Sequence, residues 1–138
     1  MIRKDYILRM IEMFGEMIAG ILGKIKKGDF EEAAQEIDDA YLEFLKQDAS
    51  VLNNIAKEEL TDRLLQEHNY TNGHLEILSE LLFAQAEMSF KQNDKKKSLE
   101  YYEKSMILLD FVVKESKTFS FEKESRLNLL RDKIAELK

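Results

Sequence analysis

Residues 74–92 read HLEILSELLFAQAEMSFKQ, and this stretch decides the fold. Apolar side chains recur in it at three- and four-residue spacing, as at Leu75, Leu78 and Leu82, which is the period of a helix. Further apolar side chains such as Phe83 fall between these positions, so the helix is apolar on several faces. A helix of that kind has to be surrounded by other elements. The stretch therefore predicts a central helix with neighbouring helices on several sides.

The helical period extends over the rest of the chain. Its 138 residues include no proline and five glycines, whereas average proteins contain roughly 5% proline and 7% glycine. Short alternating apolar runs bounded by turn residues, which would indicate strands, are missing from the sequence. We therefore expect a single all-α domain over residues 1–138 with about six helices. Its parts are a first antiparallel hairpin over about 5–46, an intervening helix over about 50–66, a second hairpin over about 74–117 and a C-terminal helix over about 121–137.

Turn and cap residues place the ends of these helices. Gly28 is expected to end the first helix, and Asp29 with Glu32 three residues later resembles a capping box for the second. Ser120 is expected to cap the last helix. The apolar pattern weakens around residues 56–61, so the intervening helix is the one most easily broken.

The charge pattern disfavours two classes of partner. A formal net charge of −6 opposes binding to nucleic-acid phosphates, although the basic run 95–97 could contact an anion. No apolar run approaches the roughly 20 residues that a transmembrane helix needs. Asp5, Arg9 and Glu12 interrupt the apolar start of the chain, which argues against a signal peptide. Nucleic-acid and membrane partners are therefore disfavoured, and a cytoplasmic location is expected.

Candidate catalytic and metal-binding residues are few. His68 and His74, the only histidines, are separated by a predicted loop and cannot form the one-turn pair of a helical zinc site. The chain has no cysteine to supply a thiolate. The carboxylates of Glu31 and Glu36 fall on the polar face of a predicted helix, where solvated charges are usual. We therefore expect no catalytic residues, no cofactor and no metal site.

Two segments share a local pattern that joins a pair of helices. Residues 26–34 read KKGDFEEAA, and residues 91–99 read KQNDKKKSL. A turn ending in aspartate, followed by alternating small and bulky residues, resembles the inner part of a tetratricopeptide repeat. The resemblance covers roughly residues 14–46 and 79–110. The two units do not follow each other directly as repeats of that family do, and Asp110 stands where the family has a proline.

The tetratricopeptide resemblance implies roles for particular residues. Small side chains would let neighbouring helices approach closely at Ala33 and Ala40 in the first unit, and at Ser98 and Ser105 in the second. The side chains that would face a partner are Glu80, Phe83, Glu87, Phe90 and Lys91 in the second unit, and Gly15, Ile18, Leu22 and Ile25 in the first.

The face of the first helix has a second interpretation. Gly15 and Gly23 recur with Ala19 between them at four-residue spacing, which creates a smooth strip for another helix. That strip can pack inside the domain or form a face for self-association. The mostly apolar residues beside it can likewise pack inside the domain instead of facing a partner. Residues 5–11, which read DYILRMI, are similar to the start of a bacterial domain family of unknown function, a resemblance that implies no activity.

The sequence thus favours a non-catalytic module for protein–protein interaction. As an adaptor, it would bind a peptide or helix of a partner protein in a groove between its helices. A structural homodimerisation domain that uses the first helix is the alternative. Peripheral association with a membrane through the first helix is a third possibility, which Glu12 and Glu16 oppose because anionic lipid repels them.

Overall fold

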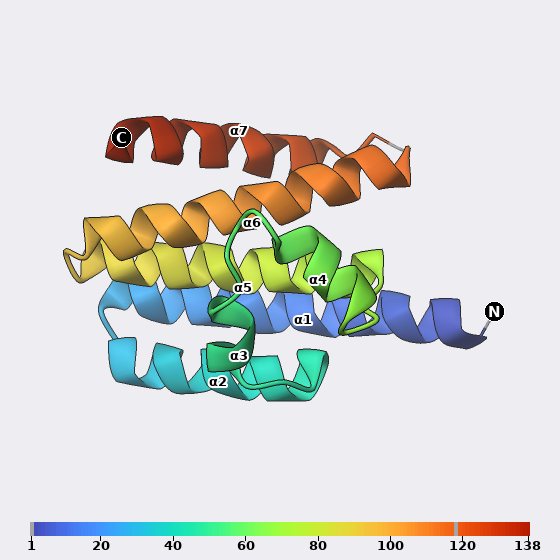
Figure 1. Ribbon diagram of the computed structural model, residues 1–138. Coiled ribbons are helices and arrows are strands. Elements are labelled where there is room, and N and C mark those ends of the chain that lie inside the picture. Colours follow the sequence, from blue (N-terminus) through green and yellow to red (C-terminus); the bar gives the residue numbers. More distant parts are fainter. Residues whose placement is uncertain (1, 118) are drawn as a thin grey trace.

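The computed structural model describes residues 2–117 and 119–138, with the side chains of residues 2–5 and 7 left out. Every regular element in this part of the chain is a helix, which confirms the all-α prediction (Figure 1). The described elements are α1 (Ile2–Lys27), α2 (Phe30–Leu45), α3 (Ala49–Asn53), α4 (Leu60–Gln66), α5 (Asn72–Lys91), α6 (Lys95–Ser116) and α7 (Phe121–Leu137).

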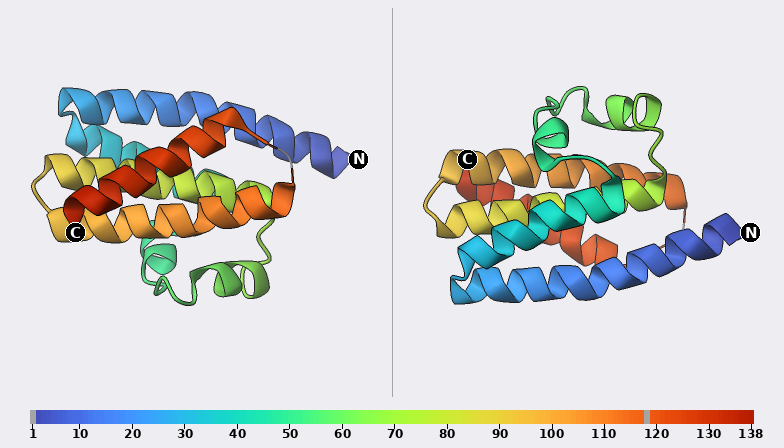
Figure 2. Two further views of the ribbon diagram at one scale, coloured as in Figure 1. Left: turned by 90° about the horizontal axis from the view of Figure 1, so that it is seen from above. Right: turned by 90° about the horizontal axis from the view of Figure 1, so that it is seen from below.

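The long helices form two antiparallel hairpins and a final helix laid across the second hairpin. Figure 1 shows α1 with α2 as the first hairpin and α5 with α6 as the second. Helix α7 lies at the edge of the bundle opposite α2, above α6 in this view. The short helices α3 and α4 lie on one side of the bundle, away from α1 (Figure 2). The second hairpin brings its helices together more extensively than any other pair, and both α1 and α2 pack on α5.

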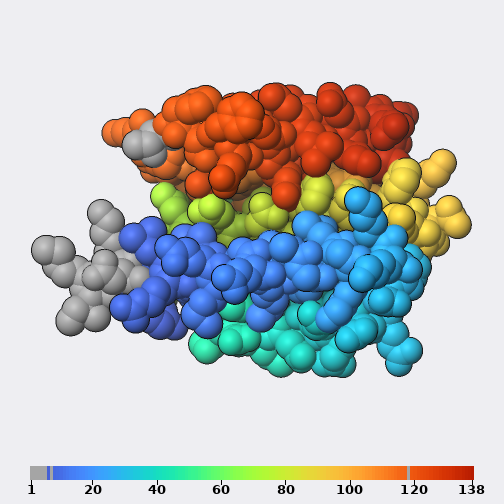
Figure 3. Space-filling model, turned by 180° about the vertical axis from the view of Figure 1, so that it is seen from behind, coloured from blue at the N-terminus to red at the C-terminus, as the bar shows by residue number. Residues whose placement is uncertain are grey.

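Helix α5 is the centre of the bundle, as the apolar pattern predicted. Its buried residues fall on most faces of the helix, because α1, α2 and α6 all contact it. Seen from behind, α5 is visible only as a narrow strip between α1 and α7 (Figure 3). Three polar side chains of α5, those of Ser79, Gln85 and Ser89, are buried with it.

The segment from 50 to 66 contains two helices where the sequence predicted one. The break has a packing reason, because Leu52, Ile55, Leu60 and Leu64 are all at most 2% exposed. At 100° per residue, a continuous helix would point Leu60 about 140° away from Ile55. Breaking the helix between α3 and α4 lets both side chains enter the core.

Cap chemistry follows the sequence at one predicted site and departs from it at another. The hydroxyl of Ser120 accepts a hydrogen bond from the backbone N–H of Lys123, as predicted for the start of α7. The prediction of a capping box at Asp29 is wrong, because the side chain of Asp29 makes no capping hydrogen bond. The carboxylate of Glu32 lies instead 3.5 Å from the ammonium of Lys24. An ion pair between α1 and α2 has replaced the expected cap.

The four small residues that the tetratricopeptide resemblance placed at close helix contacts are buried. Ala33, Ala40, Ser98 and Ser105 are each 0% exposed. Ser98 donates a hydrogen bond of 2.8 Å to the carbonyl oxygen of Ala86 in α5. Such a bond between helices requires their backbones to approach closely, which a larger side chain would prevent.

We expect Ala33→Leu to destabilise the protein by about 1–3 kcal/mol, because added volume in a filled core forces its neighbours apart. Urea unfolding of the variant measures this loss. Ala19→Leu is the matched control, since Ala19 is exposed on α1 and its free energy of unfolding should change little. Equal stability of the two variants would contradict close packing at Ala33.

Candidate functional site

The face of α5 predicted to bind a partner lies beneath α7. The guanidinium of Arg126 in α7 lies 2.6 Å from the carboxylate of Glu80, and its central carbon is 3.9 Å from the ring centroid of Phe83. Phe83 is only 4% exposed and shares a core cluster with Leu127 and Leu130 of α7. The sequence left open whether this face is open or covered by the protein's own helices. The structure covers it with α7.

The remaining predicted residues of α5 extend toward the end of that helix. The carboxylate of Glu87 accepts a hydrogen bond from the hydroxyl of Tyr102 in α6. Phe90 is half-buried, and the ammonium of Lys133 lies 5.4 Å from its ring centroid, while Lys91 is exposed. Of the five predicted residues, the structure therefore holds Glu80, Phe83 and Glu87 against α6 and α7, and leaves Lys91 at the surface.

The predicted face of α1 divides between core and surface. Ile18 and Ile25 are 7% and 2% exposed and belong to the main core cluster, which contains residues of α2 and α5. Leu22 is partly buried and contacts both core clusters. Gly15 is exposed, and a methyl group added there would meet nothing within 4 Å. The apolar members of this face pack inside the domain.

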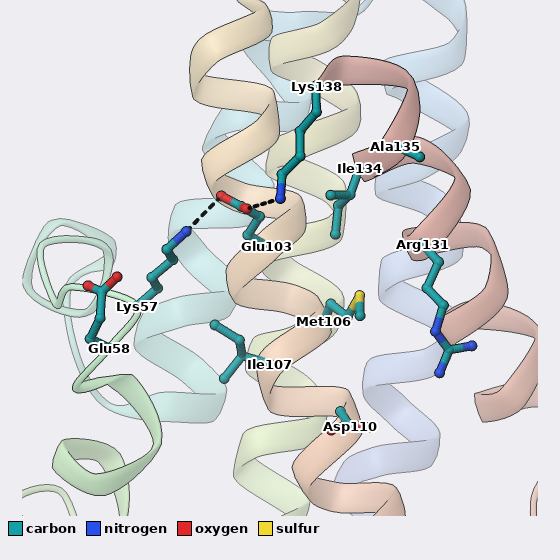
Figure 4. Close-up of a pocket in the computed structure, with 10 residues that line it drawn as sticks. All are labelled: Lys57, Glu58, Glu103, Met106, Ile107, Asp110, Arg131, Ile134, Ala135 and Lys138. Carbon is teal, nitrogen blue, oxygen red and sulfur yellow. Dashed lines mark hydrogen bonds and ion pairs between the residues drawn. The ribbon is translucent and has the colours of Figure 1, made fainter.

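A groove between α6 and α7 forms a concave site with a volume of about 610 Å³ (Figure 4). We call it the α6–α7 groove. Its apolar lining comes from Met106 and Ile107 of α6 and from Ile134 and Ala135 of α7. Its charged lining consists of Lys57, Glu58, Glu103, Asp110, Arg131 and Lys138.

Ion pairs join three of the charged side chains at one end of this groove. The carboxylate of Glu103 lies 3.3 Å from the ammonium of Lys57 and 3.6 Å from that of Lys138, so it joins the α3–α4 connection to the end of the chain (Figure 4). The side chain of Glu103 is 17% exposed, which shields these pairs partly from solvent. Across the groove, Arg131 donates a hydrogen bond of 2.8 Å to Asn128. The result is an apolar hollow flanked by fixed charges of both signs.

Little in the sequence predicts the groove. Met106 and Ile134 lie at helical spacing in two separate segments, and nothing in either segment shows that they meet. The one available signal was the neighbouring pair Met106 and Ile107, which widens the apolar surface of α6 beyond what one partner helix can cover. The charged lining, from Lys57 to Lys138, is brought together by tertiary structure alone.

A closed ring of three hydrogen bonds lies beside the core. The hydroxyl of Tyr41 donates to the side-chain oxygen of Gln85 at 2.6 Å, and the Gln85 amide donates to the Asn53 oxygen at 2.8 Å. The Asn53 amide completes the ring by donating to the Tyr41 hydroxyl at 2.9 Å. The ring ties α2, α3 and α5 together and satisfies the buried amide of α5.

The two histidines lie in an aromatic stack with Tyr70. The rings of His68 and Tyr70 are 5.5 Å apart and those of Tyr70 and His74 are 5.0 Å apart, both stacked. The Nδ1 atom of His74 accepts a hydrogen bond from the backbone N–H of Thr71. Within the described residues, no group of three or more histidine or acidic side chains could hold a metal ion.

None of the described helices is both long and apolar enough to cross a membrane.

Because Phe83 is buried beneath α7, we expect Phe83→Ala to lower the free energy of unfolding by about 3–5 kcal/mol. Phe90→Ala should lower it less, since that ring is only half-buried. Urea unfolding compares the two variants. Near-native stability of Phe83→Ala would mean that α7 does not cover this face.

Alkaline pH should destabilise the fold. Burial raises the pKa of Tyr41, and burial together with the carboxylate of Glu87 raises the pKa of Tyr102. The folded protein therefore keeps protons that the unfolded chain releases near pH 10, so this contribution to stability is complete below about pH 10 and is lost as pH rises further. Titration of phenolate absorbance checks this. Ionisation of all five tyrosines near pH 10 without unfolding would contradict it.

No family model, curated protein or solved structure matches the chain. The tetratricopeptide-like pattern and the resemblance of residues 5–11 to a bacterial family therefore remain expectations from the sequence. A function has to be inferred from the geometry of the chain itself.

Proposed function

We propose that this protein is a non-catalytic adaptor that binds an amphipathic helix of another protein in the α6–α7 groove. The observation that carries the proposal is the groove itself, an apolar hollow of about 610 Å³ at the surface between two helices. Exposed apolar concavities of this kind favour binding, because filling them removes apolar surface from water.

The shape and chemistry of the groove suit a helix. Two adjacent helices leave a furrow between them, and a third helix fits there when it presents apolar side chains at three- and four-residue spacing. Met106, Ile107 and Ile134 would contact such anchors. A hollow of this size has room for several anchoring side chains, and few residues usually carry most of the binding energy.

The charged lining supports orientation more than affinity. Lys57 and Lys138 flank one end of the groove through their shared carboxylate Glu103, and Arg131 lies on the α7 side. Charges at the edge of an interface steer association and select the direction in which a helix docks. Because the pairs at Glu103 exist before binding, a partner has few side chains of the groove to order.

Homodimerisation through α1 is the second candidate. Its supporting observation is that Tyr6 and Met13 are 63% and 60% exposed, and they lie on one face of α1. This face differs from the one containing Ile18 and Ile25, which the core of the same chain already buries. Sedimentation at several protein concentrations separates this candidate from a monomeric adaptor.

Replacing Ala135 by glutamate tests the adaptor proposal. Ala135 is exposed and lines the groove, so Ala135→Glu should leave the fold intact while placing a larger, charged side chain where apolar anchors would bind. We expect at least about tenfold weaker partner binding, since a charge at this position has to be desolvated beneath the partner's apolar side chains. The matched control is Ala19→Glu, the same substitution on the exposed face of α1.

Quantitative affinity capture from native cells provides the measurement. Wild type and Ala19→Glu should recover the same proteins, and Ala135→Glu should lose them. Titration of purified partner with the three baits then gives the change in affinity. Equal recovery by all three, with unchanged melting temperatures, would exclude the α6–α7 groove as the binding site.

A further inference from the structure

We propose that α7 exchanges between two copies of this chain, so that the α7 of each copy packs on the second hairpin of the other. The surface involved is the apolar face of α5 and α6 that α7 covers, and we call it the α7 seat. It consists of Phe83, Ala86, Tyr102 and Leu109. The occupant is therefore a second copy of this chain, with a helix whose fit to the seat is already visible in one copy.

The contacts that hold α7 on the second hairpin can be rebuilt between chains. Among its 17 residues, all of which the structure describes, Leu127 and Leu130 are the ones that are buried. The ammonium of Lys123 lies 3.2 Å from the carboxylate of Glu76. The guanidinium of Arg126 forms a second ion pair, with the carboxylate of Glu80. These contacts connect α7 to the second hairpin. A swapped helix makes the same contacts in trans, so exchange costs no packing.

Basic residues of α7 meet acidic residues of α5, which fixes how a second copy would dock. Lys123 and Arg126 lie one turn apart, as do Glu76 and Glu80. The two ion pairs align α7 along α5 in a single direction. The charge pattern of the seat thus matches α7 specifically, whereas a helix with acidic residues at these positions would be repelled.

Lys117, the residue that follows α6, has an uncommon backbone conformation. Lys117 ends α6 with a φ of +59°, in the left-handed region that residues other than glycine avoid. This conformation turns the chain back so that α7 can reach the seat of its own copy. If the connection opens, Lys117 returns to an ordinary conformation. Short hinges under strain favour domain swapping for this reason.

Two phenylalanines beside this hinge are largely exposed in a single copy. Phe119 is 80% exposed and Phe121 is 75% exposed, the highest values among the large apolar side chains that the structure describes. In a swapped pair, the two hinges pass each other near the two-fold axis. The phenylalanines of one hinge then have those of the other as partners. Burial of these rings would favour the dimer over two monomers.

The exchange is independent of the adaptor function. The α7 of a second copy would rebuild the α6–α7 groove with Met106 from one chain and Ala135 from the other. Partner binding can therefore fail while exchange occurs, and the reverse also holds. The tests of the two proposals use different residues.

Cysteine trapping detects exchange directly, because the natural chain has no cysteine. Glu76→Cys is placed in one chain and Lys123→Cys in a second chain that carries a size tag. The two are unfolded together, refolded at high concentration and oxidised. We expect a disulfide-linked heterodimer on a non-reducing gel. Position 76 of one chain lies beside position 123 of the other only when the second chain's α7 packs on the first chain's α5.

The control pair places cysteines between α1 and α2 in the same way. Lys24→Cys and Glu36→Cys replace another ion pair between two helices, and α2 has no part in the proposed exchange. Chains carrying this pair should give little heterodimer. Equal heterodimer from both pairs, or none from Glu76→Cys with Lys123→Cys, would overturn the proposal.

Hinge variants test the cause of exchange. After refolding at high concentration, sedimentation should show a severalfold smaller dimer fraction for Lys117→Gly, because glycine adopts the left-handed conformation without strain. A double variant, Phe119→Ser with Phe121→Ser, should also reduce the dimer without lowering the melting temperature of the monomer. Leu42→Ser, at an exposed site on α2, is the control and should leave the dimer fraction unchanged.

The dimer fraction also distinguishes this exchange from other forms of association. A chain that stays monomeric at every concentration would show that no second copy occupies the seat. A dimer that forms without the crosslink between 76 and 123 would assign association to another surface, such as α1. Both outcomes would refute the exchange of α7.

Discussion

The burial of α5 on most of its faces is the constraint on which the rest of the structure depends. A helix buried on most faces has no water to satisfy its polar side chains, so neighbouring helices must do so. Ser79 donates to the backbone carbonyl of Ser105, and Ser105 donates to that of Ser79, each at 2.8 Å. These reciprocal bonds require α5 and α6 to cross closely. The second hairpin is the most extensive helix pair as a consequence.

The same constraint fixes the position of α3 and, through it, one side of the α6–α7 groove. Gln85 of α5 needs both Asn53 and Tyr41, so α3 must end beside the core. Lys104 of α6 donates to the backbone oxygen of Asn53 at 2.8 Å and holds this end against the second hairpin. The chain that follows then passes α6 and brings Lys57 to Glu103. A buried amide thus positions a charge at the surface.

What the sequence predicts well is local. The period of apolar residues located the long helices, and Ser120 was identified as a cap because its bond spans three residues. Contacts between distant helices could not be predicted this way. Phe83 has the same spacing whether it lines an open groove or lies beneath α7, and its cover depends on Arg126, which is remote in sequence. The side chain of Asp29 makes no capping hydrogen bond, although Glu32 follows three residues later as in a capping box.

Helix α7 links the core to the groove because it contributes to both. One face of it closes the α7 seat through Leu127 and Leu130, and another supplies Ile134 and Ala135 to the groove. A partner helix that contacts both walls of the groove binds only when α7 is in place. Binding and docking of α7 must therefore stabilise each other by the same free energy. This coupling does not depend on which copy supplies α7, because either copy rebuilds the same wall.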